Sequence, residues 1–367
     1  MSFLEPWILL GMVAGVFQAL RVAGQRALAQ RTQADIQLSV WSAALARCLF
    51  GLPWALLILL VLIGVWGPPV GLSSDFSHNF PFTGEAVTLP FDPETGSEGD
   101  LAEGFGTGSG PDQLLQGPRL LGLPVMFWLW TLGSALLQIA ATLQQTHLLS
   151  QRNFAIGVVY VKTEVVIVAL IGSTPFFAQY LSGLQWTAVL ISVVGVVVLT
   201  RARLPGGGSS VWDLRSAWLG LSGGALLAGT SLTLREAGLI LLDEGAAVGQ
   251  PVSPAVAGMT TLVALLVIQC LVVITVMTLR DASEFNRVAR RLRPMAFTGL
   301  LSAFGSAGWF IGYVMAAPAL VKSVGQVEFI AAIILTFLLF RERPSRAEWI
   351  GMSIILISIL MLLFSTL

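Results

Sequence analysis

The feature that most constrains this chain is a succession of ten apolar segments, most of them 20 to 30 residues long. A helix of this length crosses the hydrocarbon core of a bilayer, which is roughly 30 Å thick. Backbone groups in lipid must be hydrogen-bonded within their own segment, which favours helices, and the alternation typical of a β-barrel strand is not seen. Only 11% of the 367 residues are charged, about half the share in soluble domains. We therefore predict an all-α polytopic membrane protein with ten transmembrane helices. The predicted spans lie at about residues 6–25, 38–66, 119–148, 153–172, 180–201, 215–242, 253–280, 294–317, 319–340 and 346–366.

The first five spans correspond to the second five. One motif, Ala-Gly, five residues, Arg, one residue, Ala-Gly, occurs in the first and sixth spans and matches Arg21 with Arg235 at an offset of 214 residues. Glu164 in the fourth span matches Glu328 in the ninth at an offset of 164. The difference of 50 residues is nearly the length of a polar insert in the first half. We predict two five-helix repeats. Because five is odd, the second repeat enters the membrane inverted, as in many secondary transporters.

These repeats set the domain boundaries. The first repeat comprises residues 1–66 and 119–204, and the second comprises residues 215–367. The insert, residues 67–118, is rich in Gly, Pro, Ser and acidic residues, which predicts an irregular, solvent-exposed loop. Residues 205–214, with a run of three glycines, form a linker. Whether the loop also binds a partner stays open from the sequence.

Arginine is distributed unevenly between the two sides of the predicted membrane protein. The loops after the odd-numbered spans hold 14 arginines, whereas the other side has Arg119 alone. The positive-inside rule places the arginine-rich loops in the cytoplasm and both termini and the 67–118 loop outside. No basic stretch precedes the first apolar run, which predicts a retained signal anchor and no cleaved signal peptide. We expect an integral protein of a bacterial plasma (inner) membrane.

A short passage between the last two spans carries a family resemblance. Phe340–Pro344 reads FRERP and is followed by Trp349 and Gly351. This resembles the recurring "E-R-P, then W-x-G" passage of the drug/metabolite transporter superfamily, in its ten-span EamA-type branch. The first half keeps an echo in Trp186 and Gly195 without the Glu-Arg-Pro. The resemblance implies metabolite transport, with export favoured. The long insert departs from the family, and so does the predicted outside location of the termini, because members often place both in the cytoplasm.

Other classes of function find little support. The sequence contains no phosphate-binding loop with lysine and no nucleophile motif in context, so we predict that the chain is not an enzyme and uses no cofactor. The formal net charge of zero argues against a nucleic-acid partner. Cys48 and Cys270 lie in apolar runs, which favours two small core residues. His78 and His147 are too few and too far apart for a histidine-based metal site.

Charged residues inside the spans are the leading site candidates, because each is costly in lipid unless it is paired or hydrated. Glu328 and Glu164 could bind a proton, a cationic substrate group or a lysine; the alternative is a structural ion pair between the fourth and ninth helices. The chain's only lysines, Lys162 and Lys322, lie on the same spans. Neither faces its neighbouring glutamate along its own helix. We expect Lys322 to anchor at the membrane surface, although pairing across helices is open.

Arginines and polar stripes complete the candidates. Arg21 and Arg235 could clamp a carboxylate or phosphate, or they could extend to the interface or pair with Glu236. Arg47 could face a cavity or pair with an acid. Polar stripes run along the third and eighth spans and point to a cavity or to a neighbouring helix. From these stripes and the fourth span we select four cavity-lining candidates, Gln138, Trp309, Tyr313 and Tyr160.

These observations favour a secondary active transporter, an exporter or exchanger, that moves a small polar or amphipathic metabolite by alternating access. Its partners would be the lipid bilayer, the small-molecule substrate and, as a hypothesis, a proton handled by Glu328 and Glu164. The alternative is a non-transporting membrane scaffold or accessory subunit that recruits a partner through the acidic loop. The sequence leaves the substrate and the oligomeric state open.

Overall fold

The computed structural model describes residues 5–31, 40–69, 118–149, 164–202, 214–340 and 345–365. Within these ranges the protein is helical apart from turns and one two-stranded ladder. Among the described residues, seven helical segments are long and apolar enough to cross a membrane, one of which comprises α13 and most of α14. The protein is therefore an all-α polytopic membrane protein. Its elements are α1 (Pro6–Arg31), α2 (Val40–Trp66), β1 (Arg119–Leu120), β2 (Leu123–Pro124), α5 (Val125–Leu149), α7 (Glu164–Gly172), α8 (Gly183–Ala202), α9 (Leu214–Ala247), α10 (Pro254–Arg280), α11 (Ser283–Ala289), α12 (Leu292–Met315), α13 (Pro318–Gly325), α14 (Val327–Phe340) and α15 (Arg346–Ser365).

Most of the described helices overlap predicted spans, but α11 lies between two of them, and α1 and α9 run past their predicted ends. The start of the third span differs as well. A helix from residue 119 was expected, whereas β1 and β2 form an antiparallel hairpin and α5 begins at Val125. Leu121 and Gly122 both have positive φ angles, 52° and 78°, the backbone of a tight two-residue hairpin turn. Two consecutive residues in this conformation cannot belong to a right-handed helix, so the span starts later than predicted.

The ninth predicted span, 319–340, is interrupted. α13 ends at Gly325, Gln326 caps it, and α14 starts at Val327. The Gln326 amide donates to the Ser323 carbonyl at 3.3 Å, a tightened last turn. α1 presses on this break through Gly15, where an added Cβ would come within 3.1 Å of the Glu328 amide nitrogen. Small residues let two backbones approach closely in membranes, so α1 fixes the position of the break.

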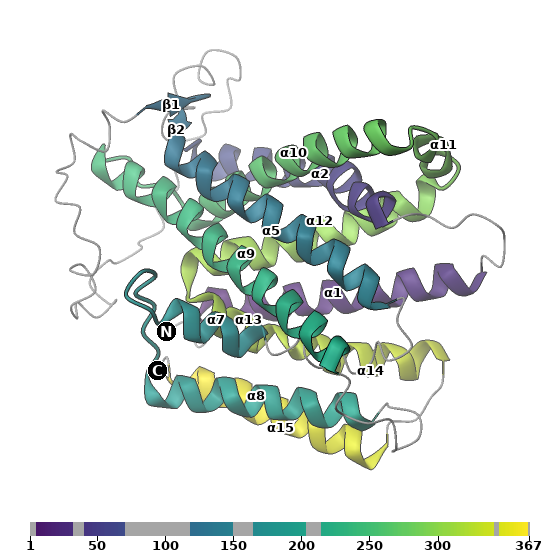
Figure 1. The fold of residues 1–367 in the computed structure, drawn as a ribbon. Coiled ribbons are helices and arrows are strands. Elements are labelled where there is room, and N and C mark those ends of the chain that lie inside the picture. Colours follow the sequence, from purple (N-terminus) through teal and green to yellow (C-terminus); the bar gives the residue numbers. More distant parts are fainter. Residues whose placement is uncertain are drawn as a thin grey trace.

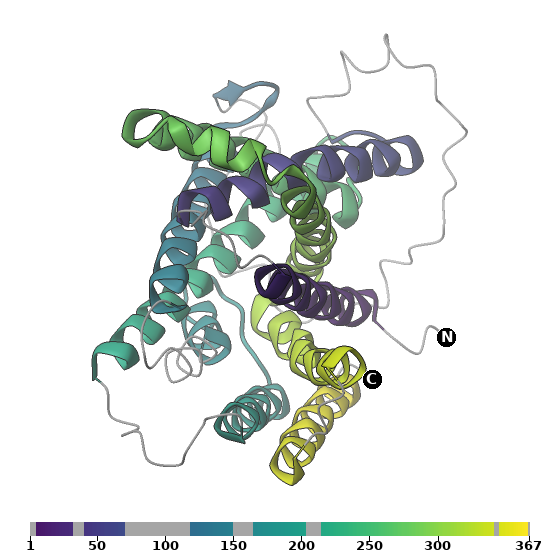
Figure 2. The same cartoon turned by 90° about the vertical axis from the view of Figure 1, so that its right-hand side faces the viewer.

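The two halves of the chain interleave. α1 packs along α12, and α5 packs along α9. α2 contacts α10, α7 contacts α13, and α8 contacts α15. Figures 1 and 2 both place α8 and α15 together at one edge of the bundle. Each of these pairs joins a helix from the first half to one from the second, so the bundle is not two separate lobes.

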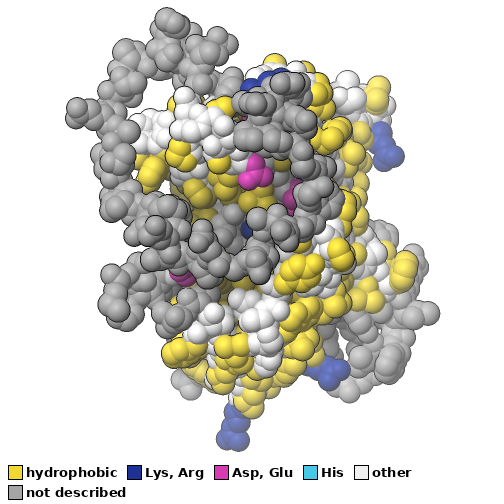
Figure 3. Space-filling model, turned by 90° about the vertical axis from the view of Figure 1, so that its left-hand side faces the viewer, with side chains coloured by type: hydrophobic (Ala, Val, Ile, Leu, Met, Phe, Trp, Pro, Cys, Tyr) yellow, Lys and Arg dark blue, Asp and Glu magenta, His cyan; other side chains and the backbone are white. Residues whose placement is uncertain are grey.

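Charge differs between the two ends of the bundle. The end of α8, the end of α10, α11 and the starts of α12 and α15 lie together on the right of Figure 1. By sequence these segments and the turns between them carry Arg201, Arg280, Arg287, Arg290, Arg291, Arg293 and Arg346. There a hydrogen bond from Ser283 and one from Arg287 lower the pKa of Asp281 below its usual range. The opposite end carries both termini and the β hairpin, whose Arg119 pairs with the buried Glu244 of α9. Figure 3 views this end and shows acidic side chains set among hydrophobic ones.

Candidate functional site

An ion pair joins the two elements that carry the predicted glutamates. Glu164 lies in the first turn of α7, and its Oε1 is 3.1 Å from Nζ of Lys322 on α13. The two side chains are only 13% and 10% exposed. The prediction that Lys322 is a surface anchor is therefore wrong, because its amine is buried beside the break in the ninth span. Glu164 Oε2 is also buried and has no hydrogen-bond partner in the described part of the chain, so it can accept one more donor.

Two aromatic rings from α12 surround the Lys322 amine. Trp309 and Tyr313 stack with their centroids 5.9 Å apart. The Lys322 nitrogen lies 6.0 Å from the Trp309 centroid and 5.9 Å from that of Tyr313, within the range of a cation–π interaction. Gly325 makes room for the indole, since an added Cβ would overlap Trp309. A carboxylate and two rings therefore form a cation site that Lys322 fills.

The cation near Glu328 is Arg21, whereas the cation paired with Glu164 is Lys322. Glu328 lies in the first turn of α14, and its charge acts on Arg21 of α1. Both side chains are half-buried. The Arg21 Nε is shielded from solvent and has no hydrogen-bond partner among the described residues. The structure thus places Glu328 and Arg21 in one electrostatic group and Glu164 and Lys322 in another.

Arg235 is held by backbone carbonyl groups. Its Nη1 donates to the Tyr313 carbonyl at 2.6 Å and to the Ala316 carbonyl at 2.8 Å, and the charge of Glu236 acts on it as well. The last carbonyls of a helix lack intrahelical partners, and a cation there is favoured by the helix dipole. Arg235 therefore caps α12, and its Nη1 is committed to the protein rather than to a clamp shared with Arg21.

The polar stripe of the third span joins helices. Gln138 of α5 accepts a hydrogen bond at 2.7 Å from the Gln269 amide of α10, and both side chains are buried. The hydroxyls of Ser134 and Thr233 lie 2.6 Å apart between α5 and α9. Of the two alternatives for Gln138, the interhelical bond is the one observed. Gln269 was missed as its partner, although an amide within the strongly apolar span 253–280 was the available signal.

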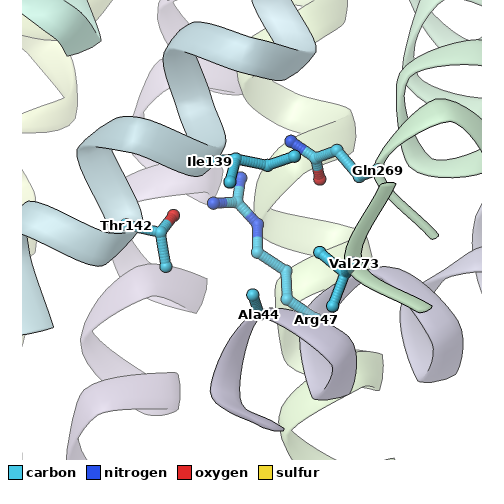
Figure 4. A pocket seen from close by; sticks show the side chains of 6 residues that line it. All are labelled: Ala44, Arg47, Ile139, Thr142, Gln269 and Val273. Carbon is cyan, nitrogen blue, oxygen red and sulfur yellow. The ribbon is translucent and has the colours of Figure 1, made fainter. Parts of the chain in front are cut away.

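Arg47 of α2 lines a small pocket together with Thr142 of α5 and Gln269 of α10 (Figure 4). The volume of this pocket, about 10 Å³, is close to the space that one water molecule needs. A larger groove of about 480 Å³ lies between α14 and α15, but Ser353 is its sole non-hydrophobic lining residue. The pocket beside Arg47 is therefore far smaller than a metabolite, and the groove of metabolite size is lined almost entirely by apolar side chains.

The remaining candidates add little to the site. Tyr160 and Lys162 lie outside the described residues. Cys48 and Cys270 are free, buried and close enough to interact with each other across α2 and α10. Across the described ranges no group of three His, Cys, Asp or Glu could hold a metal ion. The candidate site therefore consists of two sets of opposite charges, Glu164 with Lys322 and Glu328 with Arg21.

Comparisons with known proteins show the fold alone. No protein-family model and no curated protein matches the chain. A solved structure described only as "Crystal structure of protein" is similar at 14% sequence identity with a TM-score of 0.58. The similarity covers 97% of this chain and 94% of that chain. The whole bundle, rather than a piece of it, therefore has a counterpart of known structure.

Proposed function

We propose that this chain is a secondary active transporter that exports or exchanges a small polar or amphipathic metabolite by alternating access. One observation carries the proposal: the buried Lys322–Glu164 pair joins α13 to α7 beside the break in the ninth span. Broken helices near the midplane form the binding sites of many secondary transporters. Ionisable groups in a membrane interior are costly and mark pathways more often than they add stability.

The helix contacts support ten spans arranged as two inverted repeats. Matching the first span to the sixth and the third to the eighth turns the α1–α12 contact into the α5–α9 contact. When each span is replaced by its counterpart five spans away, the contact of α1 with α13 and α14 corresponds to that of α9 with α7. The contacts α2–α10, α7–α13 and α8–α15 each join a span to its own counterpart, so the replacement leaves them unchanged. Two interleaved repeats related by a two-fold axis in the membrane plane would produce this pattern.

The ends of the bundle support the proposed orientation. The arginine-rich end would lie in the cytoplasm by the positive-inside rule, and the hairpin, both termini and the 67–118 loop would lie outside. Exposed Trp218 and Trp349, 72% and 60% exposed, lie near the starts of α9 and α15 at the arginine-rich end, where tryptophan favours the membrane interface. Membership of the EamA-type branch of the drug/metabolite transporters is part of the same proposal and rests on the FRERP passage.

The proposed cycle uses competition for the charged groups. With the Lys322–Glu164 pair formed, α7 and α13 are held together and the interior is closed. A polar group of the substrate would take one partner from this pair, which allows the helices to separate towards one side. Glu328 beside Arg21 would act as the second exchange point, and protonation of either carboxylate would couple the cycle to a proton.

Loss of solute from proteoliposomes tests the proposal. Vesicles would be loaded with a defined mixture of amino acids, organic acids, phosphorylated metabolites and amines, and the solutes remaining would be followed by mass spectrometry. We expect selective loss or exchange of one class with the unaltered protein and with Arg293→Gln, an exposed control at the cytoplasmic end. Lys322→Gln should abolish it.

The scaffold alternative predicts a different result. A chain lacking residues 70–115 should keep transport if the chain is a transporter. Retention of every solute by the full chain, together with a protein that co-purifies only when residues 70–115 are present, would contradict transport and favour the scaffold.

A further inference from the structure

Arg47 differs from the other cations that the structure describes within the spanning helices. Lys322 pairs with Glu164, the charge of Glu328 acts on Arg21, and Arg235 caps α12. The charged and titratable groups that act on Arg47 are Arg21, Cys48 and Tyr313. None of these is a carboxylate, so Arg47 has no acidic partner in the described part of the chain.

Arg47 lies in a small pocket that combines apolar and polar lining residues. Its Nε is shielded from solvent and lacks a hydrogen-bond partner among the described residues. Its guanidinium extends into the pocket between α2, α5 and α10, beside the hydroxyl of Thr142 and the amide of Gln269 (Figure 4). An unpaired guanidinium in a membrane interior costs several kcal/mol. An anion bound beside the guanidinium would lower this cost.

The central charges do not balance either. Among the described residues around this site, Arg21, Arg47, Arg235 and Lys322 contribute four positive charges, and Glu164, Glu236 and Glu328 contribute three negative ones. An anionic group would neutralise this interior, whereas a cationic group would add to its excess. A guanidinium is also the side chain whose planar donors best match a carboxylate or a phosphate.

We propose that Arg47 binds an anionic group, a carboxylate or a phosphate, when the pocket opens. The inference rests on the proposed transport function and names its substrate class as anions. Arg47 lies seven residues into α2, which is about 10 Å from the cytoplasmic start of that helix. The same chemistry would also accept the phosphate of an anionic lipid headgroup from that leaflet.

Binding to the purified full chain tests this inference. The protein would be placed in nanodiscs of zwitterionic phosphatidylcholine and titrated with inorganic phosphate and with succinate at constant ionic strength, with thermal unfolding and calorimetry as readouts. We expect saturable stabilisation, with affinity reduced about tenfold or more in Arg47→Gln and reduced less in Arg47→Lys, which keeps the charge but loses the planar donors. Arg293→Gln should bind as the unaltered chain does.

A second arm identifies the source of the anion. Nanodiscs containing phosphatidylglycerol and no soluble anion would show Arg47-dependent stabilisation if a lipid phosphate occupies the site, and no such effect if the ligand is a free metabolite. Because Arg47→Gln removes a buried unpaired charge, it should fold at least as well as the unaltered chain without anions. Anion effects that are equal in Arg47→Gln and the unaltered chain would overturn the proposal, as would Arg47-dependent stabilisation by the amines choline or putrescine.

The outcome is separable from that of the transport proposal. Selective solute flux without any Arg47-dependent anion preference would overturn the anion site and leave transport standing. Arg47-dependent binding of phosphate or succinate with no flux of any loaded solute would support the anion site and overturn transport.

Discussion

Glu164 and Glu328 occupy matching positions in the sequence and lie in the first turns of α7 and α14, yet their surroundings differ. Glu164 forms a buried ion pair with Lys322 at 3.1 Å beside two stacked rings. Glu328 lies in the electrostatic field of Arg21, and α1 presses against its backbone at Gly15. Two positions that match as repeats in the sequence therefore lie beside two different cations.

The matching arginines explain the difference. The charge of Glu328 acts on Arg21, whereas Arg235 donates from Nη1 to the carbonyls at the end of α12 and leaves Glu164 to Lys322. In a transporter built from inverted repeats, the opposite-facing state arises when the two repeats exchange their arrangements. In that state Arg235 would turn toward Glu164 and Lys322 would be released. The Lys322–Glu164 pair would then belong to one state and open in the other.

The largest effect is expected from Lys322→Gln, because it leaves the Glu164 carboxylate buried without its partner. Removing one member of a buried pair costs about 3–5 kcal/mol, so thermal unfolding in detergent should occur at a much lower temperature. The matched change Arg21→Gln should cost less, since Arg21 and Glu328 are both half-buried. The double change Lys322→Met with Glu164→Leu should recover stability. Equal, small losses in Lys322→Gln and Arg21→Gln would show that the two carboxylates are equivalent after all.

The next largest loss of stability is expected from Gly325→Ala, which tests the position of the Trp309 ring beside Lys322. A methyl group there overlaps the Trp309 indole, and overpacking of this kind costs about 1–3 kcal/mol. Tryptophan fluorescence should shift as the indole moves away from Lys322. Gly133→Ala in α5 is the control, because nothing lies within 4 Å of its added Cβ. Unchanged stability and fluorescence in Gly325→Ala would show that the Trp309 ring does not pack against Gly325.

Glu328→Gln tests whether the second carboxylate carries the proton. A transport step linked to one proton changes by up to about tenfold per pH unit, and a glutamine cannot titrate. We expect Glu328→Gln to remove the pH dependence of solute flux in proteoliposomes, with Arg293→Gln as the control. Flux that keeps the pH dependence of the unaltered chain would rule out this role for Glu328.

Part of this site was predictable from the sequence. A glutamate in an apolar span is readily noticed. The two repeat offsets differ by nearly the length of the insert, which identified Glu164 and Glu328 as counterparts. Lys322 was misplaced because spacing along one helix shows only neighbours on that helix, and its partner comes from α7, 158 residues earlier. Gly325 in the middle of a span was a signal for the break. The close contacts of Gly15 and Trp309 with this position come from the packing of other helices and cannot be read from the sequence.

Arg235 shows the same limit. Its motif matched Arg21, which suggested a shared task. Its acceptors are carbonyls exposed where α12 ends, ahead of Pro318 at the start of α13. A proline after a predicted helix end is a readable signal for free carbonyls. Which side chain meets them follows from the packing of α9 against α12.

The smallest effect is expected at the bond between Gln138 and Gln269, away from both carboxylates. Interhelical hydrogen bonds in membranes contribute about 0.6 kcal/mol on average. Gln138→Leu and Gln269→Leu should each lower the unfolding temperature slightly, and a double-mutant cycle should return a coupling of that size. A coupling free energy as large as the stability lost in Lys322→Gln would show that the Gln138–Gln269 bond contributes as much to stability as the Lys322–Glu164 pair.

The most direct test of the central claim is a charge exchange, Glu164→Lys with Lys322→Glu, measured for both unfolding temperature and solute flux. If the pair belongs to the transport site, the exchange should recover the stability that Lys322→Gln loses, while flux stays abolished because the cation and the anion now stand on the wrong helices. Recovery of stability and flux together would contradict the claim and reduce the pair to a structural link between α7 and α13.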